Sequence, residues 1–311
     1  MGAGEHPPLM PDLATTYASV VRPSLVAFFY KFHDTHTTAG QLPPFPTIIG
    51  TGFVIDSDGW IATNRHVAEA FAHVPNEVRQ VIGDQIPVMA VLFQLVDGNL
   101  HLPMFQVEDV ITFDVPQRLL TQFAREAPDL AFARINVRAL PTLEIARDVR
   151  IEEGMELATS GFPMGSDALA PEGYLSQISP TLQRGIVSAV LPFPGTHPHA
   201  FLLNVMVRGG ASGSPVFFPE SGKVAGIVYA GLRDFESSKA CSYAVPTNLT
   251  YVLPAHAIST AVKILSEQGA IAPQPNAPTF ASLMAEGQTD PGPHVVPWEP
   301  LPEPKREPPS L

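Results

Sequence analysis

A serine set among closely spaced glycines is the clearest candidate for chemistry in this sequence. Ser212 stands in the stretch GGASGSPVFF, two positions after Gly210 and directly before Gly213. A glycine two positions before a nucleophile lets the backbone turn so that its N–H and that of the serine point at one spot, where they stabilise a developing oxyanion. Because such stretches are also common in turns, Ser212 is either a nucleophile or an ordinary turn residue.

A serine nucleophile needs a base, and the base needs a group that orients it, because the hydroxyl is not nucleophilic at its own pKa. His66 follows the short apolar segment WIATN and is the candidate base; the alternative is a surface histidine that caps a short helix. Asp129 directly precedes the apolar segment LAFARINV and is the candidate orienting acid; the alternative is a turn residue after Pro128.

The three candidates occur in an order that favours one scaffold. His66, Asp129 and Ser212, each at the edge of an apolar segment, follow the order of the triad in the chymotrypsin arrangement. The α/β-hydrolase scaffold would need G-x-S-x-G leading into a helix, but residue 214 is Ser and the following PVFF leads into a strand.

The elements that position these residues are predicted to be strands. Residues 23–250 contain a series of short segments rich in β-branched and aromatic residues, separated by Gly, Pro, Asn and Asp. This pattern is typical of antiparallel sandwiches and barrels. The stretch DSDG at 56–59 predicts a hairpin turn between two of the strands.

Composition divides the chain into three regions. Residues 1–22 contain a short helical candidate that Asp12 can cap. Residues 23–269 hold the strands and end in a predicted helix near 255–270, whose apolar residues recur at helical spacing. Residues 270–311 are rich in proline and are expected to be an extended or disordered tail.

Composition also argues against several classes of partner. The net charge is −12 and there is no Lys/Arg-rich stretch, so we expect no nucleic-acid partner. The apolar run LVAFFY is far shorter than the roughly 20 residues that cross a bilayer, and the N-terminus does not resemble a signal peptide. The single cysteine, Cys241, excludes an internal disulfide. We therefore expect a soluble, cytoplasmic protein without a membrane partner.

From about residue 49 to residue 248, the chain resembles a chymotrypsin-fold (trypsin-like) serine peptidase, closest to the HtrA-like branch. GTGFVIDSDGWIATNRHV resembles that branch's strand–turn–strand ending in Thr-Asn-x-His-Val, and DLAFARI resembles its Asp-Leu-Ala segment. The segments GFPMG, GIVSAV, GASGSP, GIVYAG and YAVPTN follow in the family's order. The resemblance implies an all-β fold of two packed six-stranded antiparallel barrels, with a boundary near 140–155.

The resemblance also implies a mechanism in which His66 and Asp129 belong to the first barrel and Ser212 to the second. His66 would take the proton from Ser212 and return it to the leaving amine, while Asp129 fixes the imidazole tautomer. The N–H groups of Gly210 and Ser212 would hold the oxyanion of the tetrahedral intermediate. No metal ion or organic cofactor is required.

Two departures from the family bear on regulation. Position 211 is Ala, where digestive members carry an acid that pairs with a newly cut N-terminus, and Ser214 stands where HtrA-like relatives have Gly. The resting conformation of the loop is therefore left open. HtrA-like relatives often continue into a peptide-binding PDZ domain, whereas here a helix and a proline-rich tail follow, so we expect no PDZ domain.

The same resemblance indicates the specificity of the site. Met206 would lie at the pocket base in place of the acid that selects Lys or Arg, and Cys241 would line a pocket wall. Tyr229, Ala230 and Gly231 match the strand that pairs with extended substrate. These residues favour a small or medium aliphatic residue before the cut bond; alternatively, Met206 and Cys241 are ordinary core residues.

The first hypothesis is therefore an active serine endopeptidase with protein or peptide substrates. The rivals are a catalytically silent pseudopeptidase that binds peptides, and a latent protease that a regulatory partner activates. The histidines of HDTH and THPHA have no Cys or Glu at ligand spacing, so we expect no metal site.

Overall fold

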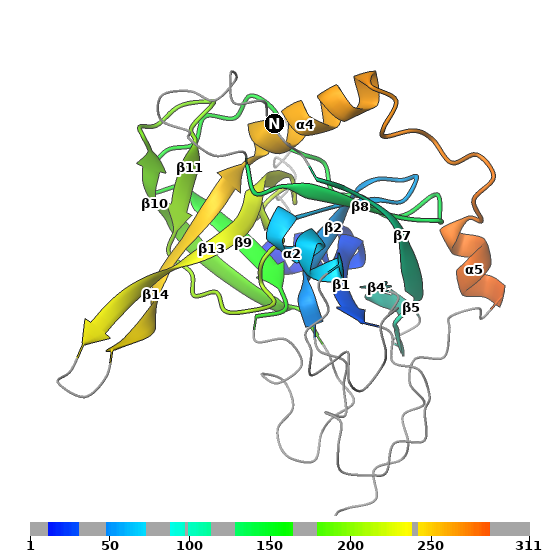
Figure 1. Cartoon of the computed structure of the whole chain (residues 1–311), viewed down its shortest axis with the longest axis horizontal. Coiled ribbons are helices and arrows are strands. Elements are labelled where there is room, and N and C mark those ends of the chain that lie inside the picture. The colour runs from blue at the N-terminus through cyan, green and yellow to red at the C-terminus, as the bar shows by residue number, and fades with distance from the viewer. Residues whose placement is uncertain are drawn as a thin grey trace, which may run out of the picture.

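The computed structural model of the chain describes residues 12–30, 48–72, 88–96, 99–112, 128–163, 179–237 and 242–286. Within these residues the strands form two closed antiparallel barrels that lie side by side (Figure 1). The predicted fold class, two packed six-stranded barrels with a C-terminal helix, is confirmed.

The strands of the first barrel present apolar residues to a common interior, and β1 is buried along its whole length. In order around the barrel, the strands are β1 (Leu25–Tyr30), β2 (Ile48–Asp56), β3 (Trp60–Thr63), β8 (Ala131–Ile135), β7 (Met104–Thr112) and β4 (Val88–Leu92). The predicted turn between β2 and β3 is confirmed, and Gly59 occupies its left-handed position with φ +95°.

The second barrel is formed by the chain after residue 155. In order around the barrel, its strands are β10 (Thr181–Leu191), β11 (Ala200–Leu203), β14 (Ser242–Pro254), β13 (Val224–Ser237), β12 (Pro215–Phe217) and β9 (Glu156–Gly161). β13 and β14 stay paired as far as Ser237 and Ser242, so they extend beyond the barrel as a two-stranded hairpin (Figure 1, yellow).

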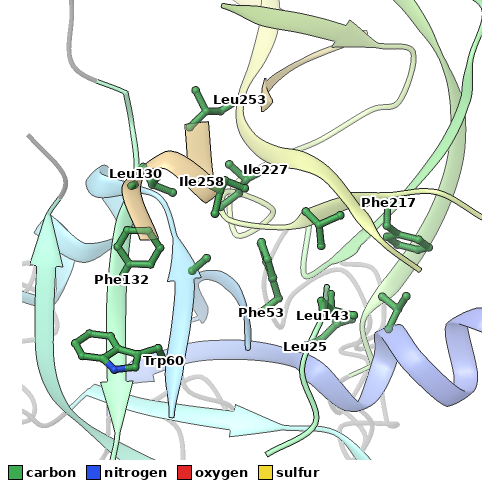
Figure 2. Packing of buried hydrophobic residues seen from close by; sticks show 14 of the residues in the cluster. Leu25, Phe53, Trp60, Leu130, Phe132, Leu143, Phe217, Ile227, Leu253 and Ile258 are labelled. Atoms are coloured by element: carbon green, nitrogen blue, oxygen red, sulfur yellow. The ribbon is translucent and has the colours of Figure 1, made fainter. Parts of the chain in front are cut away.

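The two barrels share one apolar core. Phe53 and Leu130 of the first barrel lie in one fully buried cluster with Phe217 and Ile227 of the second and with Ile258 of helix α4, which spans 255–267 (Figure 2). Burying each such side chain stabilises the fold by about 1.5–3 kcal/mol relative to exposure. Because this contact is apolar and continuous, side chains from different barrels are held in a fixed relation and can build a single site.

The N-terminal helical segment forms as predicted. Asp12 Oδ1 accepts the N–H of Thr15 at 2.8 Å and thereby caps α1 (Leu13–Thr16). The chain continues through a π-helical turn (Tyr17–Val21) and a 3-10 turn (Arg22–Ser24) before it enters β1.

The structure differs from the expected extended or disordered tail over residues 270–286. Helix α5 (Phe280–Glu286) packs on the first barrel, and the Phe280 ring joins the buried cluster of that barrel. A proline-rich composition lowers the apolar content of a segment but does not prevent a single large side chain from anchoring it. Residues 287–311 of the predicted tail lie outside the described residues.

The strands of the first half of the chain differ in part from the expected series of short apolar segments. One such segment, VMAVLFQLV at 88–96, was expected to form a single strand, but it splits into β4 and β5 (Gln94–Val96) at Phe93, which is buried and lies in neither strand. β5 pairs with β6 (Asn99–His101) as a separate small sheet. β7 was not predicted, because most of its residues are exposed or half-buried and show no apolar alternation.

Candidate active site

His66 lies on the rim of the first barrel, directly after a strand. β3 ends at Thr63, and Asn64 leads into the short helix α2 (Arg65–Ala72), so His66 is in the first helical turn. The sequence suggested either a base after a strand or a surface histidine at the start of a short helix. His66 fits both descriptions of position, because it follows β3 and belongs to α2. Its side chain is 46% exposed, as a base that must meet a substrate requires.

His66 and Asp129 form a close pair. The Nδ1 atom of His66 lies 2.6 Å from Oδ2 of Asp129, and the backbone N–H of His66 donates to Oδ1 at 3.1 Å. The carboxylate thus satisfies the N-terminus of α2 and orients the imidazole at once. Burial acts to raise the pKa of Asp129, but the hydrogen bonds and charge of His66, with the backbone N–H of Arg65, outweigh it and hold that pKa below its ordinary value.

Two neighbours of His66 hold the backbone around Asp129. Asn64 is fully buried, and its side-chain amide donates to the carbonyl oxygen of Asp129 at 2.9 Å. The Arg65 guanidinium donates to the carbonyl oxygen of Pro128 at 2.6 Å. These roles of Asn64 and Arg65 are not evident from the motifs of the sequence. The sequence signal that could have indicated them is that two polar residues, Asn64 and Arg65, stand between the apolar strand and His66.

Ser212 lies in a tight loop on the second barrel, just before β12. The N–H of Ala211 donates to the carbonyl oxygen of Arg208 at 3.1 Å, and Gly210 has φ +89°. A positive φ at the third position of a turn closed in this way defines a type II turn, and a glycine adopts it without strain.

The loop leaves two amides free. Within the part of the chain that the structure describes, the N–H groups of Gly210 and Ser212 donate to no protein acceptor. By contrast, the N–H of Ala211 closes the turn, and that of Gly213 donates to the carbonyl oxygen of Val228 at 3.0 Å. The two amides that the sequence singled out as oxyanion donors are therefore open to a ligand.

The serine loop is attached to the first barrel just beyond the point where the pairing of β2 with β3 ends. The N–H of Thr51 in β2 donates to the carbonyl oxygen of Ser212 at 2.8 Å. A Cβ atom on Gly213 would lie only 2.6 Å from the hydroxyl of Thr63, the last residue of β3 before the His66 helix. The loop therefore packs directly beside the strand that leads to His66. Among the described residues, no hydrogen bond joins the side chains of His66 and Ser212.

Four of the residues expected to contact substrate belong to the part of the chain that forms the second barrel. Met206 is 40% exposed, so the alternative of an ordinary core residue does not apply to it. Tyr229 and Ala230 are half-buried and Gly231 is exposed at the edge of β13. Burial, followed by the neighbouring hydroxyl of Tyr251 and carboxylate of Asp129, raises the pKa of Tyr229 to about 12, so this phenol stays neutral.

Several predictions fall on other parts of the chain. Cys241, His33 and His36 lie outside the described residues. His197 lies on the second barrel with its ring centroid 5.0 Å from that of His256. Among the described residues, no three His, Cys, Asp or Glu side chains gather as a metal site would require. No helix in that part of the chain has the length and apolar character needed to span a membrane.

Two six-stranded barrels, with a His–Asp pair on one rim and a glycine-flanked serine on the other, define the chymotrypsin-like class of fold. The chain belongs to the family described as the trypsin-like peptidase domain, which matches residues 50–227. The resemblance predicted from the sequence motifs is confirmed.

The curated relatives are HtrA-type proteases. A "Probable periplasmic serine endoprotease DegP-like" of Halomonas elongata is 27% identical over 65% of this chain and 33% of its own length. A "Putative serine protease HhoB" of Synechocystis is 22% identical over 70% of this chain and 42% of its own. The chain thus spans about a third of the length of the DegP-like relatives it matches.

Solved structures include similar chains as well. The serine endoprotease from Yersinia pestis is 16% identical and aligns with a TM-score of 0.49, over 83% of this chain and 68% of its own. At these values the likeness carries no inference about the chemistry of this chain.

The expected cytoplasmic location is wrong. The two DegP-like relatives are named as periplasmic proteins. The expectation rested in part on Cys241, but a chain with one cysteine forms no internal disulfide in either compartment. The cysteine count therefore does not distinguish the two.

Proposed function

We propose that the protein is a serine endopeptidase that hydrolyses peptide bonds through Ser212, His66 and Asp129. The observation that carries the proposal is the 2.6 Å pair of His66 and Asp129, on the barrel rim against which the Ser212 loop packs. Membership of the trypsin-like peptidase family supports the same activity.

In the proposed reaction, the hydroxyl of Ser212 attacks the carbonyl carbon of the substrate, and Nε2 of His66 takes the hydroxyl proton. The Asp129 carboxylate keeps the proton on Nδ1 of His66, so that Nε2 is free to act as the base. It also stabilises the imidazolium that forms. His66 then gives its proton to the leaving amine, and a water molecule, deprotonated by His66, releases the acyl group from Ser212.

The charge that develops on the substrate oxygen needs donors, and the open N–H groups of Gly210 and Ser212 would supply them. Two such donors held in place before substrate arrives cost no reorganisation in the transition state. Loss of one donor of this kind typically lowers kcat by about 10²–10³-fold.

The substrate backbone would bind along β13. This strand pairs with β14 through Ala230 and Gly231, whereas its pairing with β12 ends at Ile227. The edge of Tyr229–Gly231 that faces away from β14 therefore lies outside the β12 ladder, and an extended peptide can add to it as a further strand. We propose that the substrate has a small or medium aliphatic residue before the cut bond, because position 206 is Met and not the acid that would select Lys or Arg.

A peptide-binding protein that does not cleave is the second candidate. Within the described residues no hydrogen bond joins the side chains of His66 and Ser212, and this observation favours the second candidate. However, such bonds are often long in free enzymes and shorten only when substrate binds. The two candidates therefore differ in a measurable way, because only the first forms products.

The test is hydrolysis of a peptide library by the purified chain, followed by mass spectrometry. We expect cleavage after Ala, Val or Leu, and we expect Ser212→Ala to abolish it. Ser221→Ala is the matched control, because Ser221 is an exposed turn serine on the same barrel. Binding of library peptides without any cleavage would refute the endopeptidase, and cleavage mainly after Lys or Arg would refute the assigned pocket.

A further inference from the structure

Two residues, Thr51 and Ser214, hold three consecutive backbone carbonyls of the serine loop. The hydroxyl of Thr51 donates to the carbonyl oxygen of Gly210 at 2.7 Å, and the N–H of Thr51 donates to that of Ser212 at 2.8 Å. Between them, the carbonyl oxygen of Ala211 accepts the hydroxyl of Ser214 at 2.6 Å and the N–H of Ser214 at 3.0 Å.

Thr51 is placed for this contact by the way β2 and β3 pair. Their ladder begins at Phe53 and Ala62, so the backbone of Thr51 lies beyond it and its N–H is free to bind the loop. Thr51 is fully buried, its carbonyl oxygen accepts the Thr63 hydroxyl at 2.8 Å, and its own hydroxyl accepts the N–H of Phe162 at 3.2 Å. A buried hydroxyl with both a donor and an acceptor partner has one preferred orientation.

Two glycines leave the space that these hydroxyls occupy. A Cβ atom on Gly161 would lie 1.8 Å from Oγ of Ser214 and 2.9 Å from Oγ1 of Thr51. A Cβ atom on Gly213 would lie 1.9 Å from the carbonyl oxygen of Thr51. These distances are below any real contact. The two hydroxyls therefore depend on glycine at position 161, and the close approach of the Thr51 backbone to the loop depends on glycine at position 213.

We infer that Thr51, assisted by Ser214, is a positioning residue that keeps the oxyanion hole formed in the free enzyme. A type II turn at Gly210 and its type I alternative differ by a rotation of the central peptide, between Gly209 and Gly210, which would turn the carbonyl oxygen of Gly209 toward the place of the oxyanion and the N–H of Gly210 away from it. The hydrogen bonds from Thr51 and Ser214 hold the two peptides that follow the central one and thereby restrict the backbone shifts that accompany its rotation. The inference rests on the proposed function and adds how the site is regulated: the hole needs neither an acid at position 211 nor a bound partner.

The test compares variants that differ in one hydroxyl. Thr51→Val keeps the shape and the backbone N–H of Thr51 but removes the hydroxyl, and Thr51→Ser restores it. Thr250→Val is the matched control, because Thr250 is equally buried and its hydroxyl donates to the carbonyl oxygen of Val205, outside the serine loop. kcat and KM for one cleaved peptide and the melting temperature are measured for each chain.

We expect Thr51→Val to lower kcat by about 10–100-fold, which approaches the loss of a whole oxyanion donor, with KM within about threefold of wild type. Thr51→Ser should recover most of kcat. Ser214→Ala should lose only about three- to tenfold, because the N–H of residue 214 still binds the carbonyl oxygen of Ala211. Thr250→Val should lower the melting temperature without lowering kcat. A kcat within threefold of wild type in Thr51→Val, or equal losses in Thr51→Val and Thr51→Ser, would overturn the inference.

A crystal structure of Thr51→Val tests the same inference without any activity. We expect the loop to lose its single conformation or Gly210 to leave positive φ. An unchanged loop with both N–H groups still open would overturn the inference. A wild-type chain that hydrolyses no peptide would refute the proposed function alone, since the crystal structures still show whether the Thr51 hydroxyl sets the loop.

Discussion

Replacing Asp129 by Asn separates the orienting role of the carboxylate from its role in stability. The carboxylate accepts two hydrogen bonds from His66, at Nδ1 and at the backbone N–H, on different oxygens. An amide offers one oxygen and one NH2 group, so one of these donors must face another donor. Either the α2 helix loses its cap or the imidazole loses its orientation.

The stability cost of Asp129→Asn follows from these contacts. A hydrogen bond to a charged group contributes about 1.5–3 kcal/mol, and the Asp129 side chain is 28% exposed, so solvent screening reduces this to about 1–2 kcal/mol. For a chain of this size the melting temperature should fall by roughly 2–6 °C. The protein therefore remains folded at 25 °C.

The expected loss of activity is far larger. With Nδ1 no longer fixed as the donor, the imidazole adopts the wrong tautomer and kcat should fall by about 10³–10⁴-fold. The assay is steady-state hydrolysis of one cleaved peptide at 25 °C, with melting followed by circular dichroism. Asp109→Asn is the control, since Asp109 is an exposed carboxylate on the same barrel, 3.9 Å from Arg134. Activity of Asp129→Asn within tenfold of wild type would refute the orienting role.

Three further predictions test the structure around the site. Gly213→Ala places a Cβ atom 1.9 Å from the carbonyl oxygen of Thr51, on a residue whose φ is +88°. We expect the unfolding free energy, measured by urea titration, to fall by about 2–4 kcal/mol, and kcat for peptide hydrolysis to fall by at least about 100-fold. Burial first, and then the charges of the neighbouring His197 and His199, lower the pKa of His256 to about 4. The unfolded chain therefore binds a proton at His256 more readily than the folded chain does, and about 1–2 kcal/mol of unfolding free energy, after solvent screening, is present above pH 6.5 and is lost as the pH falls toward 4. In His256→Gln the urea midpoint should depend less on pH between 6.5 and 4 than in the wild type. The same pH dependence in both chains would contradict the assignment. Phe280→Ala should cost about 2–4 kcal/mol by urea titration, because the ring is buried against the first barrel, and a cost near zero would show that α5 does not dock there.

The barrels could be predicted from the sequence because short strand-like segments are separated by Gly, Pro, Asn and Asp, a pattern that few folds other than antiparallel sandwiches and barrels produce. The prediction failed where burial does not follow sequence pattern. Most residues of β7 are exposed or half-buried, so they show no apolar alternation. α5 is anchored by one buried ring, Phe280, in a segment whose average composition is that of a solvated tail.

The candidate site shows the same division. His66, Asp129 and Ser212 were predicted because a proton relay needs those residue types, and because their order along the chain is that of the chymotrypsin arrangement. Thr51 and Ser214 could not be predicted, because a threonine in a strand and a serine after a turn have many ordinary roles. Only the three-dimensional pairing of their hydroxyls with consecutive loop carbonyls gives them one in particular.

The central claim is that the hydroxyl of Ser212 is a nucleophile that His66 activates. The direct measurement is reaction of the purified chain with a fluorophosphonate, with the modified residue located by mass spectrometry. The account predicts a single adduct on Ser212 that forms at least about 10³-fold more slowly in His66→Ala. An adduct on a different residue, or equal labelling rates in the two chains, would contradict it.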